Sequence, residues 1–351
     1  MSTIFVKTSL MARTFLTALI LTLTASCGAH SEGNAKQYLV AFSQANNAEP
    51  YRAAQNQLMQ KLFGQYPDVH LVIDDAQQDN SKQIAQIETF IRQKPALLIV
   101  APNERAPLTE IMGKAVAAGI PVICLERDIS APNYTTFIGV DNRAIGHMAG
   151  EFIRDELARR NSGPAGGGPA GGGGPAGGGG PAGGEPHGKV VEIRGLLGVE
   201  AQTERHEGAL QALSESPNIQ IVHEAVADWL QANARERMLE ILRAEPKIDA
   251  VYAHNDPMAV GAYLAARELG RDHEMFFVGI DGLGGPAGGI QKVIDGVLAG
   301  TFYYPLCVDK AVEIGNRILR EPGFKPEKRY LLESSPVTPQ NAPQMYQRLT
   351  F

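Results

Sequence analysis

The sequence predicts an α/β protein with two doubly wound parallel-sheet lobes. Short apolar, β-branched runs recur along the chain, and a stretch with helical periodicity follows each of them. Continuous apolar strands that alternate with helices are typical of parallel sheets covered by helices on both faces. The runs fall into two series of four or five strand–helix units, which favours two lobes over one large sheet.

The two series define the elements that we expect, in chain order. The first series has strands near 38–43, 69–74, 96–101, 121–125 and 137–140, with helices near 50–65, 80–93, 104–118 and 142–160. The second has strands near 189–193, 219–225, 250–253 and 276–280, with helices near 203–216, 231–244, 257–269 and 286–296. A helix at about 306–320 and a late strand near 329–333 complete the prediction.

Composition excludes several classes of protein. The chain has 351 residues, of which 44% are hydrophobic and 20% charged, as in ordinary soluble globular proteins. This composition does not fit a disordered chain or a multi-span membrane protein. The formal net charge is −6 and no dense Lys/Arg run is present, so we expect no nucleic-acid binding. The length suits two domains, each large enough to bury a core.

The N-terminus resembles an export signal. Lys7 and Arg13 precede a short apolar run at 15–23, which is too short to span a bilayer but fits a secretory signal peptide over 1–27. The segment ending in Cys27 resembles a bacterial lipobox, which implies acylation of Cys27 and membrane contact by a lipid anchor only. A plain signal peptidase site nearby is the alternative. Either reading places the protein in the periplasm or at the cell surface.

Residues 163–184 consist only of Gly, Ala and Pro. A segment without charge and with little to bury is typical of a flexible linker. It falls between the helix near 142–160 and the strand near 189–193, within the continuing alternation of helix and strand, so we interpret it as an insert in a surface loop. After processing at Cys27, two cysteines remain; we expect Cys124, in an apolar run, to be a core residue.

Motifs of catalysis are weak or absent. Residues 282–287 match G-x-G-x-x-A, but they lie late in the series and lack the acidic residue that a dinucleotide fold needs. Residues 183–190 approach a phosphate-binding loop but lack its Ser/Thr and precede a strand instead of a helix. The chain contains no G-x-S-x-G, H-E-x-x-H or C-x-x-C. We therefore expect no catalytic residue, no metal and no cofactor, and interpret the chain as a non-enzyme.

Polar side chains gather instead after the predicted strands, where ligands of doubly wound sheets bind. Carboxylates, Arg and Asn are planar hydrogen-bonding groups suited to adjacent hydroxyls, and Trp or Tyr offers a flat apolar surface for a sugar ring. Helix capping is the alternative for any single member. Convergence from both series favours a site for a sugar. The set includes Ser43, Asn47, Tyr51, Glu126, Arg127, Asp128, Asp141, Asn142, Asp228, Trp229, Asn255, Asp256, Asp281, Tyr303 and Tyr304.

Five segments carry a resemblance to a known family. Residues 43–52, 125–127, 139–142, 254–261 and 278–282 resemble the ribose/galactose-type periplasmic sugar-binding proteins of ABC transporters (periplasmic binding protein type 1 fold), a fold shared with lactose-repressor-like effector domains. Residues 43–52 are most similar to the branch that includes galactofuranose binders. The resemblance covers about 36–335 apart from the insert.

The resemblance implies a ligand site between the lobes. Its members in this sequence are Ser43, Asn47, Glu49, Tyr51, Arg52, Glu126, Arg127, Asp141, Trp229, Asn255, Asp281 and Tyr304. Thr203 stands where family members often have Arg, and Arg205 is expected to be a structural helix residue. The resemblance also implies three crossings between lobes, near 138, 304 and 328. The N-terminal lobe would then take 36–138 plus 305–328, and the C-terminal lobe 139–304 plus 329–345.

These features predict a monomeric receptor that captures a monosaccharide by hinge closure and delivers it to an ABC permease. A sugar-sensing receptor of the same fold, coupled to a chemoreceptor or histidine kinase, is the alternative. A transcriptional regulator would begin with a helix-turn-helix headpiece, where this chain has an export signal.

Overall fold

The computed structural model describes residues 37–162 and 185–349. The predicted signal peptide over 1–27, the acylation site Cys27 and the insert at 163–184 lie outside the described residues. The described residues form one compact unit, which begins at Gln37.

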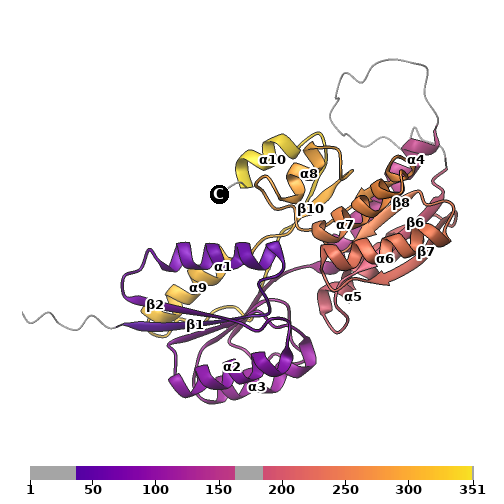
Figure 1. Cartoon of the computed structure of the whole chain (residues 1–351). Coiled ribbons are helices and arrows are strands. Elements are labelled where there is room, and N and C mark those ends of the chain that lie inside the picture. The colour runs from indigo at the N-terminus through magenta and orange to yellow at the C-terminus, as the bar shows by residue number, and fades with distance from the viewer. Residues whose placement is uncertain (1–36, 163–184, 350–351) are drawn as a thin grey trace, which may run out of the picture. The chain divides into compact units, whose positions relative to one another are not determined.

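The first lobe is built on a six-stranded parallel sheet with the order β11-β5-β4-β3-β1-β2. Its strands are β1 (Tyr38–Gln44), β2 (Val69–Asp75), β3 (Leu97–Val100), β4 (Val122–Glu126), β5 (Thr136–Val140) and β11 (Arg329–Leu332). Helices α1 (Pro50–Phe63) and α9 (Val308–Arg320) cover one face, and α2 (Asn80–Gln93) and α3 (Arg105–Ala117) cover the other (Figure 1).

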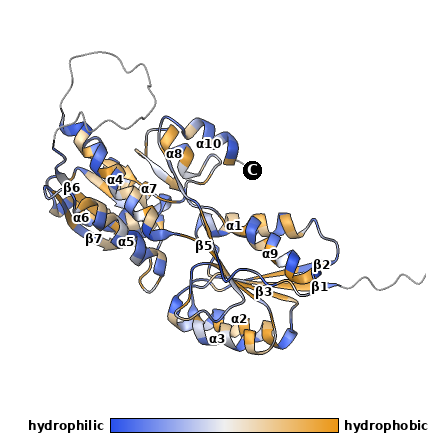
Figure 2. Ribbon diagram, turned by 180° about the vertical axis from the view of Figure 1, so that it is seen from behind, coloured by the Kyte–Doolittle hydropathy of each residue, from blue (hydrophilic) through white to orange (hydrophobic). Residues whose placement is uncertain are grey.

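Alternation of side chains along β1 explains why both faces of this sheet are covered. Val40 and Phe42 belong to the core beneath α1 and α9, whereas Ala41 between them belongs to the core beneath α2 and α3. All three side chains are fully buried. The strands β1 and β3 accordingly appear mainly apolar in Figure 2, as expected of a central parallel strand.

The second lobe is built on a four-stranded parallel sheet with the order β7-β6-β8-β9. Its strands are β6 (Gly188–Arg194), β7 (Ile219–Val226), β8 (Ala250–Ala253) and β9 (Phe276–Val278). Helices α4 (Asn142–Asn161) and α5 (Glu200–Leu213) pack on one face, and α6 (Gln231–Ala244) and α7 (Asp256–Glu268) on the other. An antiparallel pair, β10 (Thr301–Tyr303) and β12 (Ser335–Val337), lies with α8 (Gly289–Ile294), α10 (Ala342–Leu349) and a short 3₁₀ turn (Asp272–Glu274) at its margin.

The predicted α/β class with doubly wound parallel sheets is confirmed. Predicted strands and long helices agree with the structure to within a few residues at each end. Strands β10 and β12 and helix α10 were not expected from the sequence. Within the described residues, no helix is both long and apolar enough to cross a lipid bilayer.

The lobe boundaries differ from those expected near the end of the chain. Residues 329–345 were expected in the second lobe, but β11 pairs with β5 in the first sheet. All of β5 also belongs to the first sheet, so the chain passes from the first lobe to the second at 141 instead of 138. Strand β11 is a half-exposed edge strand, and such a strand carries no buried pattern that would assign it to one sheet. The three connections between lobes therefore follow β5, β10 and β11.

One hydrophobic core continues from the first sheet to the second through the middle connection. It includes Phe42 of β1 and Tyr252 of β8, and Tyr304 and Leu306 lie between them along the chain that joins β10 to α9. Cys124 and Cys307 are both buried and free, so they form no disulfide.

Candidate ligand-binding site

A cavity between the two lobes is lined almost entirely by polar and aromatic side chains. Its free volume of about 10 Å³ is far below the range of about 300–1,000 Å³ for small-molecule sites, so a ligand can enter only when the lobes move apart. Most of its residues stand at or just after the carboxyl ends of strands, as in other doubly wound sheets. The lining comprises Glu49, Tyr51, Arg52, Glu126, Arg127, Ala201, Arg205, Trp229, Asn255, Asp281 and Tyr304.

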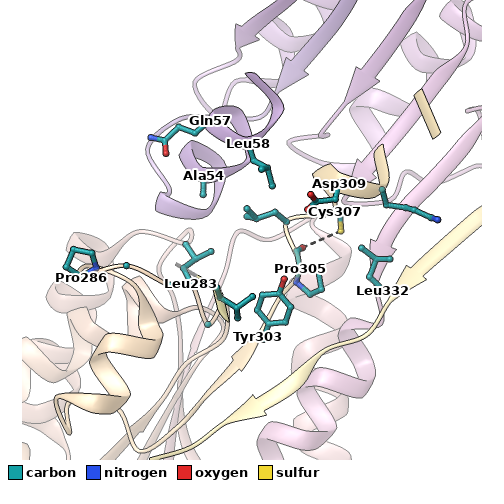
Figure 3. A pocket seen from close by; sticks show the side chains of 16 residues that line it. Ala54, Gln57, Leu58, Leu283, Pro286, Tyr303, Pro305, Cys307, Asp309 and Leu332 are labelled. Carbon is teal, nitrogen blue, oxygen red and sulfur yellow. Dashed lines mark hydrogen bonds between the residues drawn. The ribbon is translucent and has the colours of Figure 1, made fainter. Parts of the chain in front are cut away.

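A larger depression, of about 410 Å³, lies beside the middle connection (Figure 3). Ala54 and Leu58 of α1 face Leu283, Pro305 and Leu306 across it. These groups are apolar, and no set of charged side chains converges there. The smaller cavity, with charged groups from both lobes, is therefore the better candidate for a ligand site.

Three predicted site residues lie outside the cavity, whereas the other nine line it. Ser43 is fully buried at the end of β1. Asn47 is exposed and accepts a hydrogen bond from Asn56. Asp141 is exposed and caps α4, because its side chain accepts from the backbone N–H of Ala144 at 2.9 Å. The capping alternative therefore describes the role of Asp141 in this structure.

Arg205 was expected to be a structural helix residue, but it forms part of the cavity wall. Its Nε donates to Asn142 at 2.9 Å, its Nη1 donates to the carbonyl oxygen of His254 at 2.5 Å, and its Cζ lies 4.5 Å from the ring centroid of Tyr304. Ala201, which the sequence did not indicate, lies four residues earlier on the same face of α5. Thr203 is exposed. If the family's Arg had been aligned with position 205 instead of with Thr203, two positions earlier, the sequence would have indicated Arg205 as a site residue.

Glu126 is the centre of the first lobe's contribution. It accepts hydrogen bonds from Nη2 of Arg52 at 2.5 Å and from the hydroxyl of Tyr304 at 2.9 Å. Its carboxylate also lies 3.7 Å from Nε of Arg127, and Nη2 of Arg127 lies 3.6 Å from Glu49. Burial alone would raise the pKa of Glu126, but the charges of the guanidinium groups around it hold that pKa below its ordinary value.

Ionisable groups of both signs line the cavity. Three are guanidinium groups and three are carboxyl groups, of which that of Asp281 has a raised pKa. The guanidinium groups belong to Arg52, Arg127 and Arg205, and the carboxyl groups belong to Glu49, Glu126 and Asp281.

Trp229 is held in a strained turn at the second lobe's edge. Asp228 and Trp229 both have left-handed backbone conformations, with φ of 53° and 69°. Strain of this kind persists only where the surroundings hold it. Asn255 supplies one restraint: its Nδ2 donates to the carbonyl oxygen of Trp229 at 3.0 Å, while its Oδ1 caps α7 by accepting from Met258 N–H. Gly195 supplies another, because a Cβ there would lie 2.2 Å from the indole ring.

Asp281 and Asp256 form a pair of buried carboxyl groups. Asp256 accepts hydrogen bonds from Thr301 Oγ1 at 2.6 Å and from Gly282 N–H at 2.8 Å. Burial raises the pKa of Asp256 to about 7 against these hydrogen bonds. Burial, and then the charge of Asp256, raise the pKa of Asp281 well above its usual value. The Asp281 carboxyl group lines the cavity.

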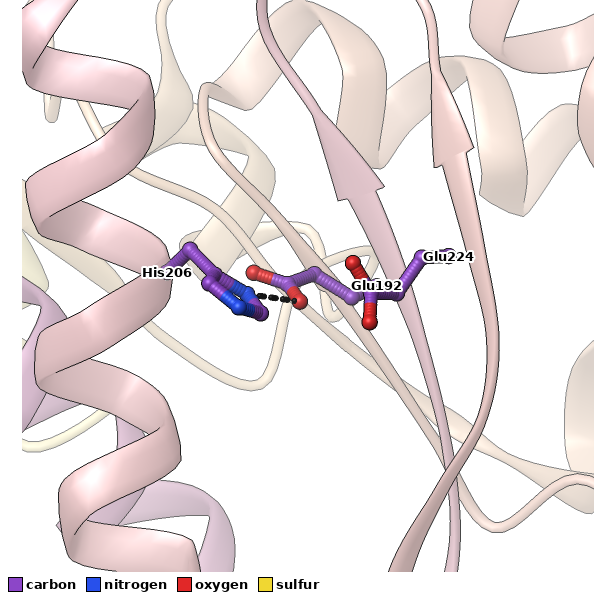
Figure 4. A group of neighbouring side chains, drawn as sticks. All are labelled: Glu192, His206 and Glu224. Carbon is purple, nitrogen blue, oxygen red and sulfur yellow. Dashed lines mark hydrogen bonds and ion pairs between the residues drawn. The ribbon is translucent and has the colours of Figure 1, made fainter.

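A second polar cluster, centred on Glu192, lies next to the cavity and contacts His254. Glu192 accepts from His254 at 2.8 Å and approaches Nδ1 of His206 at 2.7 Å; Figure 4 shows it beside His206 and Glu224. These hydrogen bonds lower the pKa of Glu192 to about 2, although burial opposes them. Glu192, His206 and Glu224 have the residue types of a cation site. However, Glu224 pairs with the guanidinium of Arg194, and both Glu192 oxygens are already engaged. Protein groups therefore engage Glu192 and Glu224, and Glu192 holds His254, whose ring centroid lies 6.4 Å from that of Trp229.

Comparison with known proteins decides the family. A family model described as a periplasmic binding protein domain matches residues 40–305. The chain is a periplasmic binding protein. This family member is 27% identical over 252 residues to the ribose import binding protein of Bacillus subtilis, covering 72% of each chain. It is also 27% identical over 258 residues to a galactofuranose-binding protein of Escherichia coli, covering 72% of this chain and 73% of the relative.

Solved structures agree with this assignment. The fructose-binding periplasmic domain of a hybrid two-component system superposes with a TM-score of 0.77 and 35% sequence identity, covering 89% of this chain and 94% of that one. A solute-binding protein from Bacillus halodurans with bound myo-inositol gives a TM-score of 0.77 at 25% identity, covering 90% of this chain and 99% of that one. The homologues of this periplasmic binding protein are substrate-binding proteins, not enzymes. The predicted family and non-enzymatic nature are thus confirmed.

Proposed function

We propose that this protein captures a monosaccharide in the cavity between its lobes by hinge closure and delivers it to an ABC permease. The observation that carries the proposal is the convergence of Arg127 from the first lobe and of Trp229, Asn255 and Asp281 from the second on one cavity. One small ligand with several hydroxyl groups can satisfy polar groups from both lobes only when the lobes close.

The relatives narrow the candidates for the ligand. Ribose, galactofuranose and fructose appear in the names of proteins that share the fold and 27–35% of the sequence. We propose that the ligand is a pentose or hexose of this kind. The protein acts in the periplasm as a monomer, with Cys27 as its lipid anchor.

Ligand release and thermal shift test this proposal. Mass spectrometry of ligand freed by denaturing the purified protein should reveal a neutral monosaccharide. A thermal-shift panel of D-ribose, D-fructose, D-galactose, L-arabinose and D-allose should give at least one stabilising sugar, because a ligand at 100 times its Kd adds about 2.7 kcal/mol. If no sugar co-purifies and none stabilises the protein, the proposed function is wrong.

A sensory role is a second candidate, because the relative with 35% identity is a domain of a hybrid two-component system. The two roles differ in the partner that recognises the closed form. Transport predicts that sugar-loaded protein stimulates ATP hydrolysis by the cognate permease in proteoliposomes. Sensing predicts instead that sugar uptake is unchanged when the gene is deleted, while the transcriptional response to the sugar is lost.

A further inference from the structure

Trp229 is the single tryptophan of the chain, and its indole nitrogen has no partner. The side chain is 3% exposed and lines the cavity. An indole N–H is a donor only, and a buried donor is normally satisfied. Among the described residues, none places an acceptor within hydrogen-bond distance of Nε1. The donor therefore requires an explanation that the rest of the fold does not supply.

The surroundings of the ring argue against a simple stacking platform, which was the role expected from the sequence. Gly195 lies so close that a Cβ at that position would overlap the six-membered ring. The guanidinium carbons of Arg127 and Arg205 lie 5.5 and 5.6 Å from the ring centroid, and the His254 ring lies 6.4 Å away. Protein groups thus surround much of the ring, whereas its N–H is unengaged.

A second unpartnered donor lines the same cavity, on a residue whose guanidinium carbon lies 5.5 Å from the Trp229 ring centroid. Nε of Arg127 has no hydrogen-bond acceptor within reach, since its nearest carboxylate, that of Glu126, is 3.7 Å away. Arg127 is also more than nine-tenths buried and lines the same cavity. Arg127 belongs to the first lobe and Trp229 to the second. The carboxyl group of Asp281 is an acceptor that lines the same cavity.

We propose that Trp229 is a specificity-determining hydrogen-bond donor, whose indole N–H binds a sugar oxygen that also accepts from Nε of Arg127. This inference rests on the proposed function, because it requires the sugar to bind in this cavity. A hydroxyl at that position accepts both N–H groups with its lone pairs and donates its proton to a carboxyl group, for which Asp281 is available. A sugar that lacks an acceptor oxygen there leaves two buried donors unsatisfied and binds weakly.

The presence of one tryptophan permits a test with an isosteric analogue. Replacement of Trp229 by β-(3-benzothienyl)alanine keeps the bicyclic ring and exchanges its N–H for sulfur. Affinities for D-ribose, D-fructose, D-galactose, L-arabinose and D-allose are measured by calorimetry on both proteins. We expect the analogue to weaken binding of any sugar that the unmodified protein binds by at least tenfold, with an unchanged unfolding midpoint.

Nuclear magnetic resonance gives a second reading that needs no variant. In ¹⁵N-labelled protein the single indole N–H gives one resonance, which should move downfield and exchange more slowly when the sugar binds. Arg127→Lys, which keeps the charge but removes Nε, should weaken binding as well. The protein that carries both the analogue at position 229 and Arg127→Lys tests whether the two donors share one oxygen. If they do, its fold-loss of affinity should be smaller than the product of the fold-losses of the two single changes.

The outcomes separate this inference from the proposed function. A sugar that binds the analogue as tightly as the unmodified protein, with the indole resonance unmoved, overturns the role of Trp229 and leaves the function standing. Losses that multiply independently overturn the shared oxygen. Failure of every sugar to bind overturns both the role and the function.

Discussion

Glu126→Gln tests whether the buried charges of the cavity hold the lobes' structure together as well as binding ligand. Glu126 is 4% exposed and accepts hydrogen bonds from Arg52, itself 1% exposed, and from Tyr304. Glutamine preserves the shape and one acceptor oxygen. It removes the charge that compensates a buried guanidinium and places an amide N–H₂ against one of the two donors.

The magnitude follows from the loss of one partner of a buried ion pair, which costs about 3–5 kcal/mol. Glutamine keeps one of the two hydrogen bonds, so we expect the free energy of unfolding to fall by about 3 kcal/mol, at the lower end. At about 2.1 cal/mol/K of unfolding entropy per residue, a chain of this length should lose about 4 °C in its unfolding midpoint.

The pH dependence gives a second signature. The folded-state pKa of Glu126 lies below its unfolded value, so its contribution is fully present above about pH 4.3 and disappears as the pH falls through the folded pKa. The difference in stability between the wild-type protein and Glu126→Gln should therefore be largest near neutral pH and shrink in acid.

Urea denaturation followed by circular dichroism, repeated from pH 7 downward, measures both effects. Glu110→Gln is a matched control, since Glu110 is 81% exposed and pairs only with Lys114 on the surface of α3. It should leave the midpoint unchanged. A Glu126→Gln protein as stable as the control, or a difference that grows in acid, would refute the assigned role of the Arg52–Glu126 pair.

Three further predictions concern binding, closure and anchoring. Asp281→Asn should weaken sugar binding by about tenfold or more, because it leaves a buried sugar hydroxyl poorly matched, and such a group typically costs about 1–3 kcal/mol. Asp141→Ala is the control: calorimetry should show normal binding, and the protein should lose only about 1 kcal/mol of stability with the helix cap. Arg105 and Glu200 form an ion pair at 3.3 Å between α3 of the first lobe and α5 of the second. Arg105→Glu should raise the apparent Kd about two- to fivefold, as expected of a part-exposed pair, and added Glu200→Arg should restore it; no restoration would mean that the pair does not stabilise the closed form. Cys27→Ala should release the protein from the membrane fraction, and a variant that still sediments with membranes would contradict lipid anchoring.

The sequence predicted those parts of the fold that repeat and those parts of the site that the fold positions. Long apolar strands such as β1 and β4 carry a pattern of burial on both faces, so their parallel sheet was predictable. Strands β10 and β12 span three residues each, too few to show any periodicity. The edge strand β11 has alternating exposed residues, and nothing local distinguishes one sheet from the other as its partner.

The same distinction holds in the cavity. Glu126, Trp229 and Asp281 were predictable because they follow strands, where the fold brings them together. Asp141 also follows a strand, but Asp is equally favoured as a helix cap, and residue type alone does not separate the two roles. Arg205 lies on the face of a helix, away from any strand end, so the strand-end rule could not indicate it.

Strand β11 has a consequence for how the chain reaches its native state. Thr136, at the start of β5, bonds through its Oγ1 to the carbonyl of Glu327, 191 positions along the chain. The first sheet is therefore incomplete until nearly the whole polypeptide has been made, and until then β5 presents an open edge to any other strand. Contacts of such long range slow folding. Synthesis from the N-terminus cannot finish one lobe before starting the next, so a fragment that ends before β11 should aggregate instead of folding into half a receptor.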